Sequence, residues 1–494
     1  MNKRFIFSLL ALIFSLSINA QNNDAYNIKV KINKTTSKEI YLGFHYDNNK
    51  YVKDTAKVNS KGEFVFSGKE KLETGLYLIV LENMQMFEIL IDDNQHFSIE
   101  TDTLDLAKNA KFKNHPLNTA FYNFILDNAK NSQTLMSYKS RLSELDPKSD
   151  SAKFYQSEIE KINNNVTKAQ DDIIAKFPNS LLANMFLATK DVPNPLPLNT
   201  KDDTLNYFHY NLNHYWDNFK WSDGGLARTP ILYNKLNTFF EKMVYKVPDS
   251  LIKYSDIVLE KSKAHKENYK YTVQFLYKTF ANSKMVCHEN VIHHIAKNYY
   301  TKDKAWWADT ATLNRIEKTV ADMEGTLCGQ TVHNLSLPDT SGIKFHQLYK
   351  KNADYTVLIF WDPNCGHCQK EIPRLQNILD SALTKMGVDV YGVCTQRNLE
   401  ELRKFVKEKE IKFLNTLVTE DMAKYPERYI YTDKVTDIKS MNLHKTFNIK
   451  STPLIFVLDK DKKILASKLN VEDLAPFLKA YERQQKAIKE LQKK

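Results

Sequence analysis

The sequence predicts a multidomain protein with a small antiparallel all-β domain, an all-α middle domain and an α/β domain at the C-terminus. Apolar residues alternate with polar ones between 26 and 104, recur every three or four positions between 116 and 323, and form a continuous run at Tyr355–Trp361. These patterns are typical of strands, amphipathic helices and a buried strand, respectively. With 494 residues, the chain is long enough for several such cores.

The first twenty residues have the layout of a secretory signal peptide. Lys3 and Arg4 precede an apolar stretch that ends near Ile18, and Asn19-Ala20 offers a cleavage site after Ala20. This stretch is too short to predict a membrane span, and no later segment approaches about 18 apolar residues. No cysteine follows it for a lipid anchor. We therefore expect an exported or periplasmic protein that is soluble after cleavage, with no stable membrane insertion.

The charge and cysteine content exclude two classes of protein. Removing the signal peptide takes two positive charges from the net +11 and leaves +9. This charge is spread over lysine-rich helix faces and the tail 479–494, which indicates a solvated surface and not a nucleic-acid site. Five cysteines in so long a chain do not make a disulfide scaffold.

Residues 26–104 are predicted to form a small antiparallel sandwich or barrel of six to eight strands. Ile28, Val30 and Ile32 illustrate the alternation, and residues 59–62 carry the Asn and Gly of a hairpin turn. The histidines and acids of this region share no common spacing, so we expect no catalytic site here.

Residues 116–323 are predicted to be helical, divided by prolines into units of ordinary helix length. Aromatic residues gather between 207 and 221, and large aromatics at helical spacing indicate a core more often than a peptide-binding surface. The cluster consists of Tyr207, Phe208, Tyr210, Tyr215, Trp216, Phe219 and Trp221.

Three histidines in the helical region resemble a zinc protease motif, but their spacing does not match it. That motif needs two histidines four residues apart, on one helix face. His288 and His293 are five apart, about 140° around a helix from each other, and His294 lies further round. We therefore expect no metal site, and surface or core histidines instead.

The last domain, 325–494, is predicted to alternate strands and helices. After a leading hairpin near 334–345, we expect strands at 355–361, 388–393, 454–458 and 464–467, and helices after 365, at 399–409, near 438–447 and from about 471. The strand at 388–393 should lie parallel to the first, reached by a right-handed crossover.

Two cysteines follow the buried strand and provide the chemistry. Asp362, Pro363 and Asn364 break the strand, and Cys365 and Cys368 then stand at i and i+3, where a disulfide between them is reachable. Cys365 should lie in the first turn of a helix, where free N–H groups and the helix dipole favour a thiolate. It is therefore the predicted nucleophile.

Neighbouring residues are placed to modulate the pair. His367, when protonated, would stabilise the thiolate and make the disulfide more oxidising. Glu371, one turn beyond Cys368, is placed to accept the proton of the deeper thiol. Pro373 should bend the helix. Far downstream, Thr452-Pro453 precedes an apolar run, and only an X-Pro bond is readily cis.

Together these features resemble a thioredoxin domain. The resemblance rests on Trp361, the two cysteines, a proline eight residues after Cys365, and Thr452-Pro453 before a strand. It implies that Cys365 attacks, Cys368 resolves, and Pro453 is cis and lies against the dithiol. Glu371 is similar to the acidic residue of the exported TlpA/ResA-like branch, whereas the Cys-Gly-His-Cys sequence resembles disulfide isomerases.

The other two regions resemble partners of this domain in the same exported family. Residues 26–104 are similar to a β-rich N-terminal domain of unknown function, and 216–230 resembles part of a helical middle domain. The resemblance implies a role in docking or in presenting substrate.

Other uses of the two cysteines fit the sequence less well. A zinc site needs two further ligands at suitable spacing, and haem attachment needs histidine at 369, where Gln369 stands. Resemblance to peroxiredoxins would require Thr or Ser at 362, where Asp362 stands. Cys287, Cys328 and Cys394 remain unassigned; Cys394, beside the active site, could be a further redox thiol or a buried free cysteine.

The sequence therefore predicts an exported thiol-disulfide oxidoreductase that needs no cofactor and favours reduction or isomerisation over oxidation. Its partners would be exported protein thiols and disulfides and a redox partner that the sequence does not identify. The alternative from another class is a non-catalytic peptide- or glycan-binding protein that uses the thioredoxin domain as a scaffold.

Overall fold

The computed structural model describes residues 24–491, with side chains through 486. The predicted signal peptide lies outside the described residues. The chain forms two compact units, Met1–Asn237 and Thr238–Lys494. No helix among residues 24–491 combines the length and the apolar character that crossing a membrane requires.

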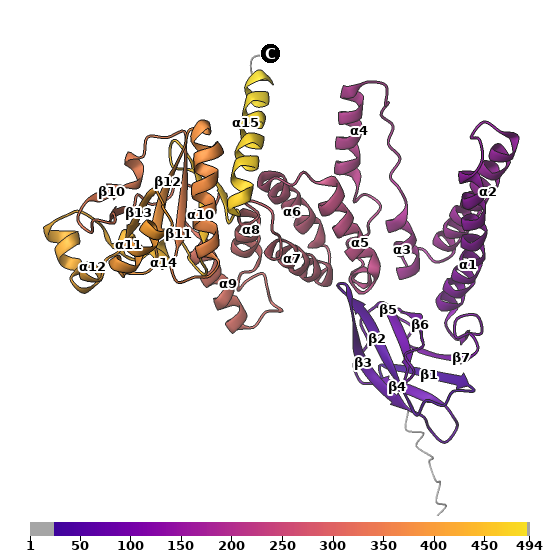
Figure 1. The fold of residues 1–494 in the computed structure, drawn as a ribbon. Coiled ribbons are helices and arrows are strands. Elements are labelled where there is room, and N and C mark those ends of the chain that lie inside the picture. Colours follow the sequence, from indigo (N-terminus) through magenta and orange to yellow (C-terminus); the bar gives the residue numbers. More distant parts are fainter. Residues whose placement is uncertain (1–23, 492–494) are drawn as a thin grey trace, which may run out of the picture. The chain divides into compact units, whose positions relative to one another are not determined.

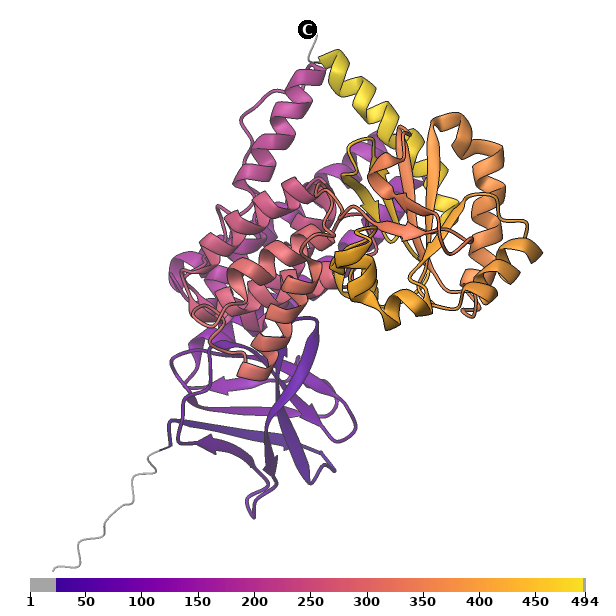
Figure 2. The same ribbon diagram turned by 90° about the vertical axis from the view of Figure 1, so that its left-hand side faces the viewer.

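The first unit begins with eight strands in two four-stranded sheets (Figures 1 and 2). The strands are β1 (Tyr26–Asn33), β2 (Glu39–Tyr46), β3 (Asn49–Lys57), β4 (Phe64–Gly68), β5 (Gly75–Leu81), β6 (Met86–Ile91), β7 (His96–Asp102) and β8 (Lys111–Lys113). Their orders are β4-β1-β7-β8 and β3-β2-β5-β6. Ile28, Val30 and Ile32 face the core, which confirms the predicted alternation.

One pairing departs from the expected antiparallel arrangement, because β1 and β7 run parallel. The other pairings of these sheets are antiparallel. Alternation decides which side chains face the core, but it does not decide strand direction.

In the described part of the first unit, α-helices follow the strands, and the last of them ends at the boundary with the second unit. They are α1 (Pro116–Ser143), α2 (Asp150–Lys176), α3 (Leu181–Thr189), α4 (Lys201–His214) and α5 (Pro230–Thr238). Of the predicted aromatic cluster, Trp216, Phe219 and Trp221 are buried, which confirms their place in the core.

Four helices open the second unit: α6 (Pro248–Ser262), α7 (Lys266–Ala281), α8 (Glu289–Tyr299) and α9 (Thr310–Met323). Proline is the first residue of α1, α5 and α6, where its missing N–H costs no helical hydrogen bond.

The rest of the second unit has a thioredoxin-like fold. A short hairpin, β9 (Ser336–Pro338) and β10 (Phe345–Gln347), precedes a sheet of order β13-β12-β11-β14-β15. Its strands are β11 (Tyr355–Trp361), β12 (Val388–Cys394), β13 (Leu414–Leu417), β14 (Leu454–Asp459) and β15 (Ile464–Ser467). β12 is parallel to β11, as predicted, whereas β14 is antiparallel to it.

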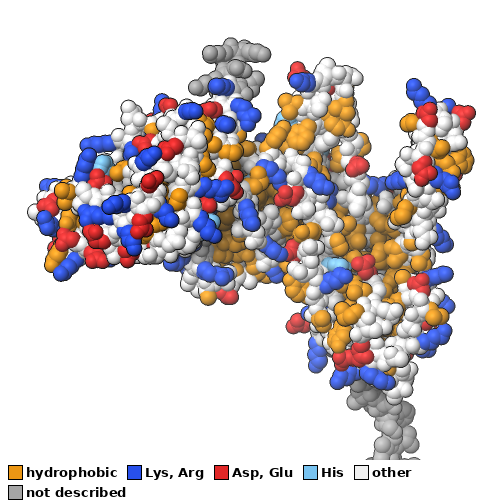
Figure 3. All heavy atoms as spheres, in the orientation of Figure 1, with side chains coloured by type: hydrophobic (Ala, Val, Ile, Leu, Met, Phe, Trp, Pro, Cys, Tyr) orange, Lys and Arg blue, Asp and Glu red, His pale blue; other side chains and the backbone are white. Residues whose placement is uncertain are grey.

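Helices cover both faces of this sheet (Figure 1). They are α10 (Cys368–Ile378), α11 (Leu399–Glu408), α12 (Glu420–Lys424), α13 (Ile438–Met441), α14 (Leu443–Thr446) and α15 (Leu474–Leu491). Core residues of α10, α11 and α15 pack with Val357 and Ile359 of β11, and those of α12 and α14 with Leu358 and Phe360. On the side seen in Figure 3, basic and acidic side chains are interspersed over this domain.

Candidate active site

The sheet register brings the two parts of the predicted site together. β11 ends at Trp361, and its neighbour β14 begins at Leu454, which pairs with Phe360. Because the strands are antiparallel, the loop that leaves β11 and the loop that enters β14 meet at one edge of the sheet. These loops carry Cys365 and Thr452 respectively.

The loop after β11 is held by its own backbone. The N–H of Cys365 donates to the carbonyl of Asp362 at 3.1 Å, and the N–H of Gln369 donates to the carbonyl of Cys365 at 3.0 Å. The helix α10 begins only at Cys368, so Cys365 does not lie in its first turn as predicted. Cys365 therefore lies just before α10, but its carbonyl still accepts a hydrogen bond from the residue four positions later, as in a helix.

The two thiols of the pair differ in environment. Cys365 is half-buried, and a hydrogen bond from the backbone N–H of Cys368 lowers the pKa of its thiol below the ordinary value. Cys368 is fully buried, and this burial raises the pKa of its thiol to about 11. A dithiol with one accessible, acidic member and one shielded member is suited to sequential attack.

The loop before β14 lies against the accessible thiol. The peptide bond between Thr452 and Pro453 is cis. The Cys365 thiol donates to the carbonyl of Thr452 at 3.5 Å. The structure thus places the predicted cis-proline beside the dithiol.

Glu371 is the buried carboxylate nearest along the helix, one turn beyond Cys368. Its exposed fraction is 9%. Arg374 lies 3.6 Å away, and a second nitrogen of Arg374 contacts Glu472 at 2.7 Å. The negative charge of Glu371 is therefore partly balanced by the guanidinium of Arg374, which also pairs with the more exposed Glu472.

Trp361 is completely buried beneath the site. Its indole N–H donates to Oδ1 of Asn415 at 3.1 Å, and the amide of Asn415 donates to the carbonyl of Phe413 at 2.9 Å. Sequence reasoning missed Asn415. The sequence feature that could have identified Asn415 is its polar side chain inside the short strand β13, because a buried amide needs a specific hydrogen-bond partner.

A pocket of about 250 Å³ opens beside the dithiol. Its lining includes His367 and Glu371 of the dithiol segment, Pro453, Lys468 and, from α9, Met323. His367 is exposed and precedes α10 without capping it. The pocket therefore adjoins the predicted modulating residue His367, the predicted catalytic residue Glu371 and the cis-proline.

The remaining cysteines play two different parts. Cys287 and Cys328 form a disulfide, which the sequence did not reveal. Cys394 is buried in the core with Cys368, and its burial raises the pKa of the thiol to about 12. The location of Cys394 is that of an inert buried cysteine.

His288, which precedes α8, and His294 within it make separate contacts. His288 lies 2.8 Å from the hydroxyl of Ser283, and His294 lies 2.7 Å from a carboxylate oxygen of Asp256. Within residues 24–491, no group of three or more His, Cys, Asp or Glu side chains is arranged to hold a metal.

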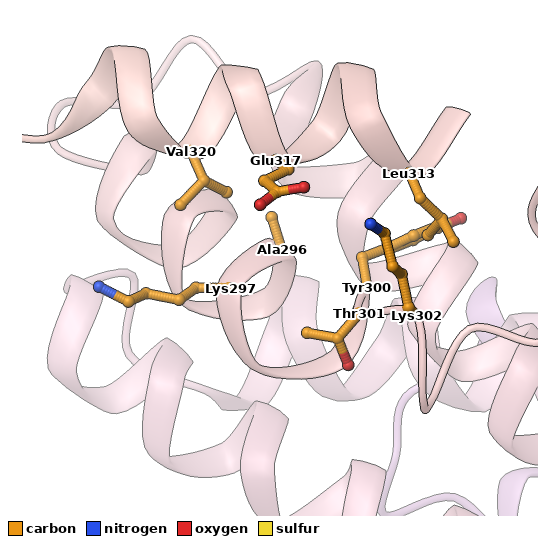
Figure 4. A pocket seen from close by; sticks show the side chains of 8 residues that line it. All are labelled: Ala296, Lys297, Tyr300, Thr301, Lys302, Leu313, Glu317 and Val320. Carbon is orange, nitrogen blue, oxygen red and sulfur yellow. The ribbon is translucent and has the colours of Figure 1, made fainter. Parts of the chain in front are cut away.

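A second hollow, of about 360 Å³, lies between α8 and α9 (Figure 4). The buried side chains of Ala296 and Leu313 line it together with Val320, and so do the exposed side chains of Lys302 and Glu317. No cysteine is among the residues that line it.

Family models match three regions of the chain. Residues 26–121 match a domain of unknown function, DUF4369, and residues 147–324 match a second one, DUF5106. Residues 328–467 match the AhpC/TSA family. No curated protein matches the chain.

Solved structures resemble the chain mainly at its C-terminus. A domain of a possible thiol-disulfide isomerase from Cytophaga hutchinsonii is 34% identical, covering 33% of this chain and 99% of that one, with a TM-score of 0.28. A thioredoxin-like protein from Bacteroides caccae is 17% identical, covering 59% and 99%, with a TM-score of 0.40. A putative thiol:disulfide interchange protein DsbE from Chlorobium tepidum is 20% identical, covering 33% and 97%, with a TM-score of 0.24.

The assignment rests on the AhpC/TSA match and on the 34% identity across nearly the whole Cytophaga domain. Both fall on the region that carries the dithiol. Through this C-terminal domain, the chain belongs to the thioredoxin-like thiol-disulfide oxidoreductases.

Proposed function

We propose that the protein exchanges disulfides with exported protein substrates through Cys365 and Cys368, as a reductase or isomerase more than an oxidase. The observation that carries this proposal is the asymmetry of the two thiols. Cys365 is accessible and has a lowered pKa, whereas Cys368 is fully buried and has a raised one.

In the first step, the Cys365 thiolate attacks one sulfur of a substrate disulfide. A bond forms between Cys365 and that sulfur, the substrate disulfide breaks, and the second substrate sulfur leaves as a thiolate. A hydrogen bond from the N–H of Cys368 stabilises this thiolate.

In the second step, Cys368 loses its proton and attacks Cys365. The mixed disulfide breaks, the remaining substrate thiolate leaves, and the enzyme retains the two sulfurs as a disulfide, so that two electrons pass to the substrate. Because the pKa of Cys368 is raised to about 11, this thiol needs a proton acceptor at neutral pH. Glu371, buried one turn away, is the proposed acceptor.

The remaining roles follow from the position of each group. Protonated His367, beside Cys365, would favour the thiolate and so raise the tendency to oxidise or isomerise. Pro453 and Thr452 would receive an extended substrate strand, and Trp361 supports the site from below. The electrons reside in the dithiol, so no organic cofactor or metal is required. A separate redox partner would restore the dithiol in the exported compartment.

The reduction potential of the pair tests this function. The mature protein is equilibrated in glutathione buffers, and free thiols are counted in the parent chain and in Cys365→Ser. A reduction potential of about −270 mV indicates a reductase, and one of about −180 mV indicates an isomerase. A value near about −120 mV would indicate an oxidase and overturn the proposed direction. The absence of a two-electron transition that Cys365→Ser removes would overturn the enzyme itself.

A further inference from the structure

A second loop lies against the one that carries the dithiol. It follows β12, whose last residue, Cys394, pairs with Trp361, the last residue of β11. Because the two strands are parallel, the loops that leave them meet at one edge of the sheet. The N–H and the hydroxyl of Thr395 both donate to the carbonyl of Trp361, at 2.8 and 3.3 Å. Two donors therefore fix the carbonyl at the end of β11.

The peptide unit that contains this carbonyl also faces the buried thiol. Its N–H belongs to Asp362 and donates a hydrogen bond to the sulfur of Cys368. This bond opposes the effect of burial on the pKa of the thiol, because it favours the charged form. Donors at the carbonyl of a peptide unit polarise its N–H and strengthen the bond that the N–H makes. The two bonds from Thr395 thus support the bond to Cys368.

The side chain of Asp362 fixes the same peptide unit from the other direction. Asp362 is half-buried. One of its carboxylate oxygens accepts from the amide of Gln396 at 2.6 Å, and the other accepts from the N–H of Asn364 at 2.8 Å. The bond from Asn364 closes a turn of the kind that Asp favours, and the bond from Gln396 ties this turn to the loop after β12. Asp362 is therefore held by both loops.

We propose that Asp362 is a positioning residue, which Gln396 holds so that the Asp362 N–H stabilises the Cys368 thiolate in the second step of the exchange. This inference rests on the proposed function and deepens it by naming the group that meets the charge of the resolving sulfur. The proton of Cys368 passes to its acceptor, whereas the N–H of Asp362 keeps its proton. When Cys368 bonds to Cys365, the negative charge passes to the substrate sulfur, which leaves as a thiolate.

The rates of the two steps test the inference. Reduced protein is mixed rapidly with a peptide that contains one disulfide, and acid quenching follows formation and resolution of the mixed disulfide separately. Asp362→Ala removes both side-chain bonds of Asp362. It should slow resolution about tenfold, near the lower end of what a hydrogen bond to a charged group contributes, and leave formation unchanged.

Asp362→Asn separates the position of this side chain from its charge. The introduced amide can accept from the N–H of Asn364 and, with the amide of Gln396 turned over, donate to Gln396. It keeps both bonds without the negative charge, so resolution should return to the parent rate. Gln396→Leu should slow resolution less than Asp362→Ala does. Combining the two should slow it no further than Asp362→Ala alone, because the two residues share one bond.

A matched control removes a bond of the same kind elsewhere. The amide of Gln376 in α10 donates to Asp380, beyond the end of that helix, at 2.9 Å. Asp380→Ala should leave the rates of both steps unchanged.

Hydrogen exchange measures the bond to the sulfur directly. In reduced protein labelled with ¹⁵N-aspartate, the N–H of Asp362, assigned by its loss in Asp362→Asn, should exchange slowly. Cys368→Ala removes the acceptor sulfur and Gln396→Leu releases the side chain of Asp362, so both should accelerate this exchange. Asp380→Ala should not. This measurement and the rates of Gln396→Leu decide the matter even where Asp362→Ala does not fold.

The outcomes separate the inference from the function on which it rests. The role of Asp362 is overturned, with the oxidoreductase intact, if Asp362→Ala slows both steps equally or neither. It is also overturned if Asp362→Asn is as slow as Asp362→Ala, or if Cys368→Ala does not accelerate exchange at Asp362. If Cys368→Ser traps no mixed disulfide and a small disulfide such as hydroxyethyl disulfide is not reduced by the parent chain, the proposed function itself fails.

Discussion

Removing the Cys287–Cys328 disulfide should destabilise the unit that contains the active site. The two cysteines are 41 positions apart. Closing a loop of that length removes chain entropy from the unfolded state worth about 4 kcal/mol at 25 °C. In a unit of about 250 residues, each kcal/mol changes Tm by about 2 °C, so the loss corresponds to about 8 °C. The hydrogen bonds from Asn290 to Cys328 remain and hold the folded joint between α8 and the segment after α9 in place.

Calorimetry in a simplified background measures this loss. Cys365→Ser/Cys368→Ser removes the dithiol, so that only one disulfide and Cys394 remain. Adding Cys287→Ser/Cys328→Ser should lower the Tm of one transition by about 8 °C in oxidising buffer. A phosphine reductant should bring the background protein to the same Tm and leave the quadruple variant unchanged.

The number of reactive thiols tests whether Cys287 and Cys328 are bonded. In denaturant without reductant, the background protein should expose one reactive thiol, that of Cys394. Three reactive thiols would show that Cys287 and Cys328 are not bonded. One thiol together with an unchanged Tm would show that the disulfide exists but that chain entropy does not govern the stability of this unit.

Three further substitutions or titrations probe the site. The rate of alkylation of reduced Cys365 should have its pH midpoint below the ordinary thiol value of about 8.5, because the lowered pKa preserves the thiolate to lower pH. The rate should fall as the pH drops through that pKa. The buried thiol of Cys368, with its raised pKa, should stay unreactive at neutral pH. A midpoint at or above about 8.5 would contradict the assigned environment. Glu371→Gln should leave formation of the mixed disulfide unchanged in stopped-flow experiments and slow its resolution about 100-fold; equal slowing of both steps would exclude a proton-acceptor role. Asn415→Leu leaves the indole N–H of Trp361 unpaired and should cost about 1–3 kcal/mol in urea unfolding, much of which Trp361→Phe should recover in the double variant; full additivity would refute the pairing.

The dithiol and its supporting strand could be predicted because their signals are local. An apolar run, a break and two cysteines at i and i+3 specify strand, turn and helix within fifteen residues of chain. The prediction that Cys365 lies in the first turn of α10 was wrong, because its carbonyl accepts a helical hydrogen bond although the residue itself is not helical. The first residue of this helix depends on the conformation of the turn that begins at Asp362.

The features that escaped prediction all depend on distant parts of the chain. Three cysteines remained after the dithiol, and no spacing rule selects Cys287 and Cys328 over Cys394. The bond forms because the start of α8 and the segment after α9 meet in the fold. Asn415 reaches Trp361 across β12, and the parallel pairing of β1 with β7 likewise joins segments far apart in sequence.

The reactivity of the dithiol and the stability of this unit depend on different contacts. The groups that lower the pKa of Cys365 lie within its own loop and in Thr452. The Cys287–Cys328 disulfide, by contrast, lies at the joint where the DUF5106 match ends at 324 and the AhpC/TSA match begins at 328. The disulfide spans that boundary and ties the two matched regions together. Changes in the joint should therefore alter stability, whereas changes between Asp362 and Cys368 should alter the chemistry itself.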